Sequence, residues 1–208
     1  MPTESVLFRG VKTPLDKIEV GASRIAGPPD LPIGVLWPVG PDRERLLPMV
    51  LQLRLADVPR TRLPRAGTLY FFGAQVAGYR GDEIDEIPAA IIYAPPGATL
   101  VRGAMPPEAN DAYWDVTHVA RCEGWRMHVS ATEEDEPTDD DIHVLFPTRK
   151  CSSFGETPPA GFVPLLELRS DYAIAMNWGD AAWATWSLPD ADLTAGNFER
   201  AIATVWIG

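Results

Sequence analysis

Residues 21–72 constrain the fold of this chain more than any other stretch. Nine of residues 21–41 are glycine or proline, which favours turns. The same segment carries apolar side chains that would be costly to leave in water, so we predict a structured loop rather than a linker. These side chains are Ile25, Leu31, Leu36 and Trp37.

Two strand patterns follow this loop. Residues 46–55 alternate apolar positions with Gln52 and Arg54, and residues 68–72 are rich in aromatic side chains. The 21 prolines of the chain argue against long helices and for turns and edge strands. We predict a mainly β (β-rich α+β) fold with a short helix over residues 192–202. Further strands are expected at residues 89–93, 113–119, 125–129, 142–146, 162–168 and 182–188. Residues 1–20 are amphipathic and of uncertain type, with a short strand at 6–12 as one option, and residues 205–207 form a last strand or a packed tail.

With 208 residues, the chain is longer than one average domain and shorter than two. A chain of this size can bury a full core without stabilising disulfide bonds or metal ions. The two cysteines, Cys122 and Cys151, do not form a disulfide framework. No window is apolar enough for a signal peptide or a membrane span. We therefore expect a single domain over residues 1–208 that is cytoplasmic and has no membrane partner.

The first hairpin pattern recurs near the end of the chain. Residues 51–54 (LQLR) match residues 166–169 (LELR) at a separation of 115, and the same offset places residues 67–71 on residues 182–186. An ancient duplication would explain this match, and coincidence between two amphipathic hairpins is the alternative. The related halves would cover about residues 21–95 and 142–208.

The charge of the chain limits its partners. The net charge is −11, and an acidic surface repels phosphate backbones, so we expect no nucleic-acid partner. A run within residues 133–141 is either a solvated loop or a surface that docks a basic protein. Its carboxylates are Glu133, Glu134, Asp135, Glu136, Asp139, Asp140 and Asp141.

Two polar segments are candidates for a ligand site. Ser23-Arg24 before a glycine would bind an anion through the guanidinium and backbone N–H groups, or Arg24 would tie down loop carbonyls. Trp178-Gly179-Asp180 combines a flat aromatic face, a sharp turn and a carboxylate, which suits a polar ligand or a structural turn.

Metal and catalytic patterns are weak. His118, Cys122 and His128 lack the paired spacing of a zinc site, and His143 beside the acidic run lacks the spacing of a calcium loop. Cys151 has no local nucleophile signature, and no phosphate-binding or dinucleotide-binding motif is present. We therefore assign no catalytic residue, metal or cofactor.

Several of these segments together resemble the YwqG-like family, a bacterial family of unknown function. The resemblance covers both ends of the chain and little of residues 73–150. It implies a roll of antiparallel sheets with few helices, and it implies no catalytic activity. The matching residues are Ser23-Arg24, Gly27, Pro28, Leu31-Pro32, Trp37-Pro38, Gln52, Leu63-Pro64, residues 67–72, Ser170-Asp171 and Trp178-Gly179-Asp180.

This sequence departs from the family pattern at four positions. Ala26 stands where the first glycine of a pair is usual, and Glu167 replaces a second glutamine. Arg169 replaces an aspartate, and Ala182 replaces a late glycine. If the family shares a ligand, these changes put its retention here in question.

Three functions remain open from the sequence, and the last of them is a structural accessory domain. The first is a non-enzymatic binding protein, in one version an immunity-type inhibitor that neutralises a basic toxin domain through the acidic run. The second is a small-ligand binder or enzyme, which predicts that six side chains meet in one pocket. These are Ser23, Arg24, Gln52, Tyr70, Trp178 and Asp180.

Overall fold

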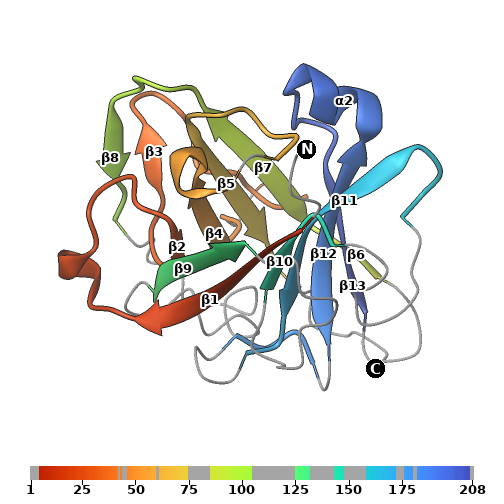
Figure 1. Ribbon diagram of the computed structural model, residues 1–208, viewed down its shortest axis with the longest axis horizontal. Helices are drawn as coiled ribbons and strands as arrows, with labels where there is room; N and C mark the ends of the chain where they lie inside the picture. The colour runs from red at the N-terminus through yellow and green to blue at the C-terminus, as the bar shows by residue number, and fades with distance from the viewer. Residues whose placement is uncertain are drawn as a thin grey trace.

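The computed structural model shows a mainly β protein, as predicted (Figure 1). It describes residues 5–41, 43, 46–59, 61–74, 85–104, 125–131, 143–147, 158–171, 176–179 and 182–206. The predicted strand at residues 113–119 lies outside this part of the chain. The strands are β1 (Val6–Lys12), β2 (Arg24–Ile25), β3 (Asp30–Pro32), β4 (Met49–Arg54), β5 (Thr68–Gly73), β6 (Asp85–Ile87), β7 (Ala89–Ala94), β8 (Leu100–Arg102), β9 (Trp125–Ala131), β10 (His143–Leu145), β11 (Phe162–Arg169), β12 (Trp183–Pro189) and β13 (Ile202–Trp206).

Eleven of these strands form one sheet, in the order β6-β13-β12-β11-β10-β1-β9-β2-β4-β5-β7. The remaining two, β3 and β8, pair with each other, and every described pair is antiparallel. β6 and β7 lie at opposite ends of the order although only Pro88 separates them in sequence. The segment therefore pairs with β13 through its first part and with β5 through its second, which curls the sheet into a roll.

Short helices connect a few of the strands. Pro14 precedes the 3-10 helix η1 (Leu15–Lys17), and η2 (Leu55–Asp57) follows β4 directly. The helix predicted over residues 192–202 is wrong in its bounds, because α2 spans Asp190–Ala195. Gly196 ends it in the left-handed conformation (φ 68°). Among the described residues, no helix has the length and apolar character needed to cross a membrane.

The two hairpins that match in sequence also match in strand register. Gln52 pairs with Tyr70 between β4 and β5, and Glu167 pairs with Thr185 between β11 and β12. The register of each hairpin also shifts by one residue, at Val50 in β4 and at the equivalent position in β11. The offset of 115 that relates the two sequences therefore relates the pairing and the bulges as well.

Each bulge accepts the same kind of backbone hydrogen bond, from a residue in the left-handed conformation. Ala26 follows β2 with φ 60°, and its N–H donates to the carbonyl of Val50 at 3.1 Å. Phe146 follows β10 with φ 53°, and its N–H donates to the carbonyl of Leu165 at 2.7 Å. Non-glycine residues rarely adopt this left-handed conformation, so its occurrence at both positions is strong evidence that the two bulges have the same structure.

The symmetry extends to the centre of the sheet. β2 lies between β4 and β9, and β10 lies between β11 and β1, while β1 and β9 pair with each other around Arg9 and His128. With β1, β2, β4 and β5 taken as one set and β9, β10, β11 and β12 as the other, the first strand of each set pairs with the second strand of the other. This pairing interlocks the two sets. Whether a duplication produced this symmetry stays a prediction.

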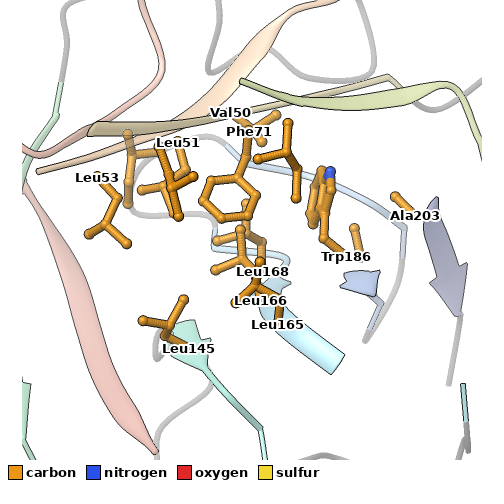
Figure 2. Close-up of a cluster of buried hydrophobic side chains, with 14 of the residues drawn as sticks. Val50, Leu51, Leu53, Phe71, Leu145, Leu165, Leu166, Leu168, Trp186 and Ala203 are labelled. Atoms are coloured by element: carbon orange, nitrogen blue, oxygen red, sulfur yellow. The ribbon is translucent and has the colours of Figure 1, made fainter. Parts of the chain in front are cut away.

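The main core lies between the two symmetric sets of strands (Figure 2). Leu51 and Leu53 of β4 face it from one side, and Leu166 and Leu168 of β11 face it from the other. Phe71 and Trp186 occupy equivalent positions, and their rings meet edge to face with centroids 6.2 Å apart. The symmetric hairpins therefore bury their inner faces against each other.

A second, smaller core lies on the other face of β4 and β5. Met49, Tyr70 and Phe72 pack there against Leu31 and Leu47 from the preceding loop. Trp37 joins this cluster at its edge, where its indole N–H donates to the Leu47 carbonyl at 2.6 Å. Residues 27–41 and 46–48 thus cover this face of the sheet, and the loop predicted over residues 21–41 is structured.

Candidate functional site

Arg24, Gln52 and Tyr70 form a row across three neighbouring strands. Arg24 pairs with Gln52 between β2 and β4, and Gln52 pairs with Tyr70 between β4 and β5. Because side chains alternate along a strand, this row lies opposite the face that Ile25 and Leu51 present to the main core. All three side chains of the row are fully buried.

Asp30 is the centre around which this row is organised. Its carboxylate accepts hydrogen bonds from the Gly21 N–H at 2.7 Å, from Gln52 Nε2 at 2.9 Å and from Arg102 Nε at 2.7 Å. Its backbone N–H donates to Gln52 Oε1 at 2.9 Å, and the Tyr70 hydroxyl donates to its carbonyl. We call Arg24, Asp30, Gln52, Tyr70 and Arg102 the Asp30 network.

The two guanidinium groups of the network bind loop carbonyls as well as Asp30. Arg24 donates to the carbonyls of Ala26 and Pro28, and its Nη2 lies 3.5 Å from Asp30 Oδ1. Arg102 donates to the carbonyl of Leu15 at 2.8 Å and to that of Ile18 at 3.0 Å. The geometry around Arg24 is therefore the one expected if this residue ties down the loop.

The electrostatics of the network keep its charges in place at neutral pH. Burial lowers the pKa of Arg24 to about 10, although Asp30 opposes this shift. Burial alone would raise the pKa of Asp30, but the hydrogen bond from Arg102 and the charge of Arg24 outweigh it, so that pKa is lowered. Burial raises the pKa of Tyr70 to about 12, so its hydroxyl remains a donor.

Ser23 belongs to a different set of contacts. Its hydroxyl donates to Asp57 Oδ2 at 2.7 Å and accepts a hydrogen bond from the Arg54 N–H at 2.9 Å. Arg54 Nε also donates to Asp57 Oδ1 at 2.9 Å, which closes a small cluster at the end of β4. Ser23 therefore neighbours Arg24 in sequence and fixes η2 rather than the Asp30 network.

Trp178 lies in the main core rather than beside Arg24. Its ring is fully buried and meets Trp186 edge to face, with centroids 5.9 Å apart. Ser170 Oγ holds the turn that follows, because it accepts from the Trp178 N–H and donates to the Gly179 carbonyl, both at 3.0 Å. Asp180 and the seven acidic residues of the 133–141 run lie outside the described residues.

The structure thus brings three of the six predicted site residues into one network. Arg24, Gln52 and Tyr70 contact one another through Asp30, whereas Ser23 and Trp178 have separate partners. Asp30 and Arg102 were not predicted from the sequence, where the signal for Asp30 is a charged residue inside an apolar, proline-rich loop. A ligand role for the predicted set stays a prediction.

A second polar cluster occupies the symmetric place in the other half. The Arg169 N–H donates to His143 Nδ1 at 3.3 Å, as the Arg54 N–H does to Ser23 Oγ. His143 Nε2 lies 3.5 Å from Asp171 Oδ2, and both residues are buried. The described part of the chain holds no group of three or more histidine, cysteine, aspartate or glutamate side chains suited to a metal ion. His118, Cys122 and Cys151 lie outside it.

Glu167 stands where the first half has Gln52, and it is a buried carboxylate. Burial raises its pKa, although Arg169, whose Nε donates to it at 3.2 Å, opposes the shift. The folded protein therefore binds this proton more tightly than the unfolded chain does. Stability from this group is greatest below the unfolded pKa and is lost as pH rises through the raised folded pKa.

Glu167→Gln, which copies Gln52, is expected to stabilise the protein at neutral pH by on the order of 1 kcal/mol, because a buried charge is replaced by an amide of equal size. Urea unfolding measured from acidic to neutral pH checks this, and the gain should grow as pH rises. Glu199→Gln, at an exposed position, is the matched control. A gain that is constant across the pH range would contradict the assignment.

Exposed apolar side chains gather on the loop that the Asp30 network holds. Leu36 is 86% exposed and Ile33 is 70% exposed, and Val35, Val39 and Val101 of β8 are exposed as well. The prediction that Leu36 is buried is therefore wrong, because the chain turns Trp37 inward and leaves Leu36 in solvent. We call residues 33–39 with Val101 the apolar loop.

The comparisons with known proteins find one match. The model of the family described as "Domain of unknown function (DUF1963)" matches residues 23–150, which include β2, β4, β5 and the whole Asp30 network. No curated protein matches the chain. Because the match covers more than half of the sequence, the chain belongs to the DUF1963 family of unknown function.

Proposed function

We propose that this protein is a binding module that docks a partner protein through the apolar loop. The observation that carries the proposal is the exposure of Leu36 and Ile33 on a loop fixed by buried contacts. Large apolar side chains that gather on one surface favour association, because burying them against a partner removes their apolar area from water.

The contacts beneath the loop prepare it for binding. Hydrogen bonds of the Asp30 network hold residues 21–32 in place, and the Trp37 indole anchors the next turn to the Leu47 carbonyl. The Ile33 N–H also donates to the carbonyl of Thr99, the residue before β8, at 3.1 Å, which ties the loop to this strand. A surface ordered before binding loses less conformational entropy when a partner docks, and this favours affinity.

The charge of the protein indicates the kind of partner. A net charge of −11 attracts a basic protein and raises its rate of association. One concrete version is an immunity-type protein that neutralises a basic toxin domain, with the acidic residues of the 133–141 run adding to the attraction. The alternative of a small polar ligand gains less support, because the Asp30 network already pairs its own carboxylate, amide and hydroxyl.

Leu36→Ser is expected to weaken capture of the partner by about tenfold or more, as for the loss of a central apolar contact. The measurement is capture from native lysate with wild type and variant in parallel, followed by titration of the captured protein. Val11→Ser is the matched control, because Val11 is 53% exposed on β1, outside the apolar loop. Equal binding of both variants, or the return of no protein partner, would contradict the proposal.

A further inference from the structure

A groove continues the apolar loop along the edge of the roll. Its volume is about 420 Å³, and one wall is formed by Val39 and Leu47 while the other is formed by Glu86, Ile87, Ala201 and Ile202. Val39 is 47% exposed and belongs to both features, so the loop and the groove form one continuous surface. We call this feature the side groove.

The side groove is large enough for part of a partner protein. An apolar cavity of about 150 Å³ already holds a benzene ring, so a groove of this volume accepts more than one large side chain. Both walls are fixed in place, because Leu47 in one and Ile87 in the other are almost fully buried. Ile87 pairs with Ala203 across β6 and β13, which fixes the second wall to the main sheet.

The described lining of the side groove carries one charged side chain, which is acidic. Glu86 is exposed on β6 opposite Thr204, and the described lining residues include no lysine or arginine. The protein as a whole carries a net charge of −11. An apolar side chain that enters this groove is therefore best accompanied by a basic residue that pairs with Glu86.

We propose that the side groove receives a segment of the basic partner, with apolar side chains against Val39 and Ile202 and a lysine or arginine beside Glu86. This inference rests on the proposed function and extends it, because it names the chemistry of the segment that binds. The apolar loop supplies the first contact area, and the side groove adds a pocket with a preferred charge.

The test uses the full chain as bait for a phage-displayed library of random peptides. Enriched peptides are synthesised with a fluorescent label, and their affinity is measured by fluorescence polarisation. We expect peptides that combine large apolar residues with lysine or arginine. Their binding should weaken as ionic strength rises, because salt screens the attraction of exposed charges.

Two variants with matched controls locate the binding. Ala201→Trp fills the groove, and Ala191→Trp adds the same bulk at an exposed position on α2. Glu86→Lys reverses the charge without filling the groove, and Glu199→Lys does the same at an exposed position elsewhere. We expect Ala201→Trp and Glu86→Lys each to weaken peptide binding by about tenfold or more, and the controls to leave it unchanged. Because Glu86 is exposed, Glu86→Lys leaves the core intact, and the test stands even if Ala201→Trp fails to fold.

The outcomes separate this inference from the proposed function. If Leu36→Ser weakens partner binding while Glu86→Lys and Ala201→Trp leave peptide and partner binding unchanged, the proposed function stands and the side-groove inference is overturned. If no peptide is enriched, or the enriched peptides are acidic, the inference is overturned as well. If the groove variants weaken binding and Leu36→Ser does not, the side groove is supported and docking by the apolar loop is contradicted.

Discussion

Asp30→Ala is expected to lower the free energy of unfolding by about 3–5 kcal/mol, the cost of breaking a buried charge pair from one side. The substitution leaves the fully buried Arg24 without its carboxylate partner and removes the acceptor of Arg102 Nε. The Gly21 N–H and Gln52 Nε2 lose the same acceptor. Urea unfolding at neutral pH measures the loss.

The control for this variant is Asp16→Ala, because Asp16 is an exposed residue whose described ion pair is with Lys17 on the surface. The pH dependence gives a second readout. The pKa of Asp30 is lowered in the folded state, so its contribution is present above the unfolded pKa and is lost as pH falls through the folded pKa. Asp30→Ala should therefore remove part of the acid sensitivity. A loss no larger than that of Asp16→Ala would show that the network does not hold the loop.

Trp186→Ala is expected to destabilise the protein by about 3–5 kcal/mol, the usual cost of removing a large buried aromatic side chain. Trp186 contacts Phe71 and Trp178, and its indole N–H donates to the Phe72 carbonyl at 3.2 Å. It therefore joins the two symmetric halves as well as filling the main core (Figure 2). Trp206→Ala should cost less, because Trp206 is only half-buried where it stacks on Trp183.

The interlocked strands add an expectation about cooperativity. β1 pairs with β10, and β9 pairs with β2, so neither half of the sheet is complete without a strand from the other. Urea unfolding of Trp186→Ala followed by tryptophan fluorescence and by far-ultraviolet circular dichroism should thus give one coincident transition. Two separated transitions would show that the halves unfold independently.

The sequence predicted the hairpins well because their signal is local. Apolar alternation in residues 46–55 and aromatic residues in 68–72 determine β4 and β5, and the same pattern at an offset of 115 determines β11 and β12. The curl of the sheet was not predictable in the same way. It depends on one segment around Pro88 pairing with β13 and β5, which lie far apart in the sequence.

The site was harder to predict because its contacts join distant segments. Asp30 and Arg102 are separated by 72 positions, and no pattern in either segment indicates the other. The apolar side chain of Leu36 predicts a buried position, yet the neighbouring Trp37 packs against the second core instead. The helix was predicted too long because Phe198 packs in the core after Gly196 has already ended α2. In each case contacts between distant segments determined the structure, and the local sequence pattern did not distinguish the alternatives.

We propose the apolar loop, held in place by the Asp30 network, as the docking surface of this protein. The most direct measurement places a photo-crosslinking amino acid at position 36 and, as a control, at position 11, and illuminates each protein in native lysate. The account predicts a discrete protein adduct from position 36 that excess wild-type protein competes away, and none from position 11. The same adducts from both positions, or none from position 36, would contradict it.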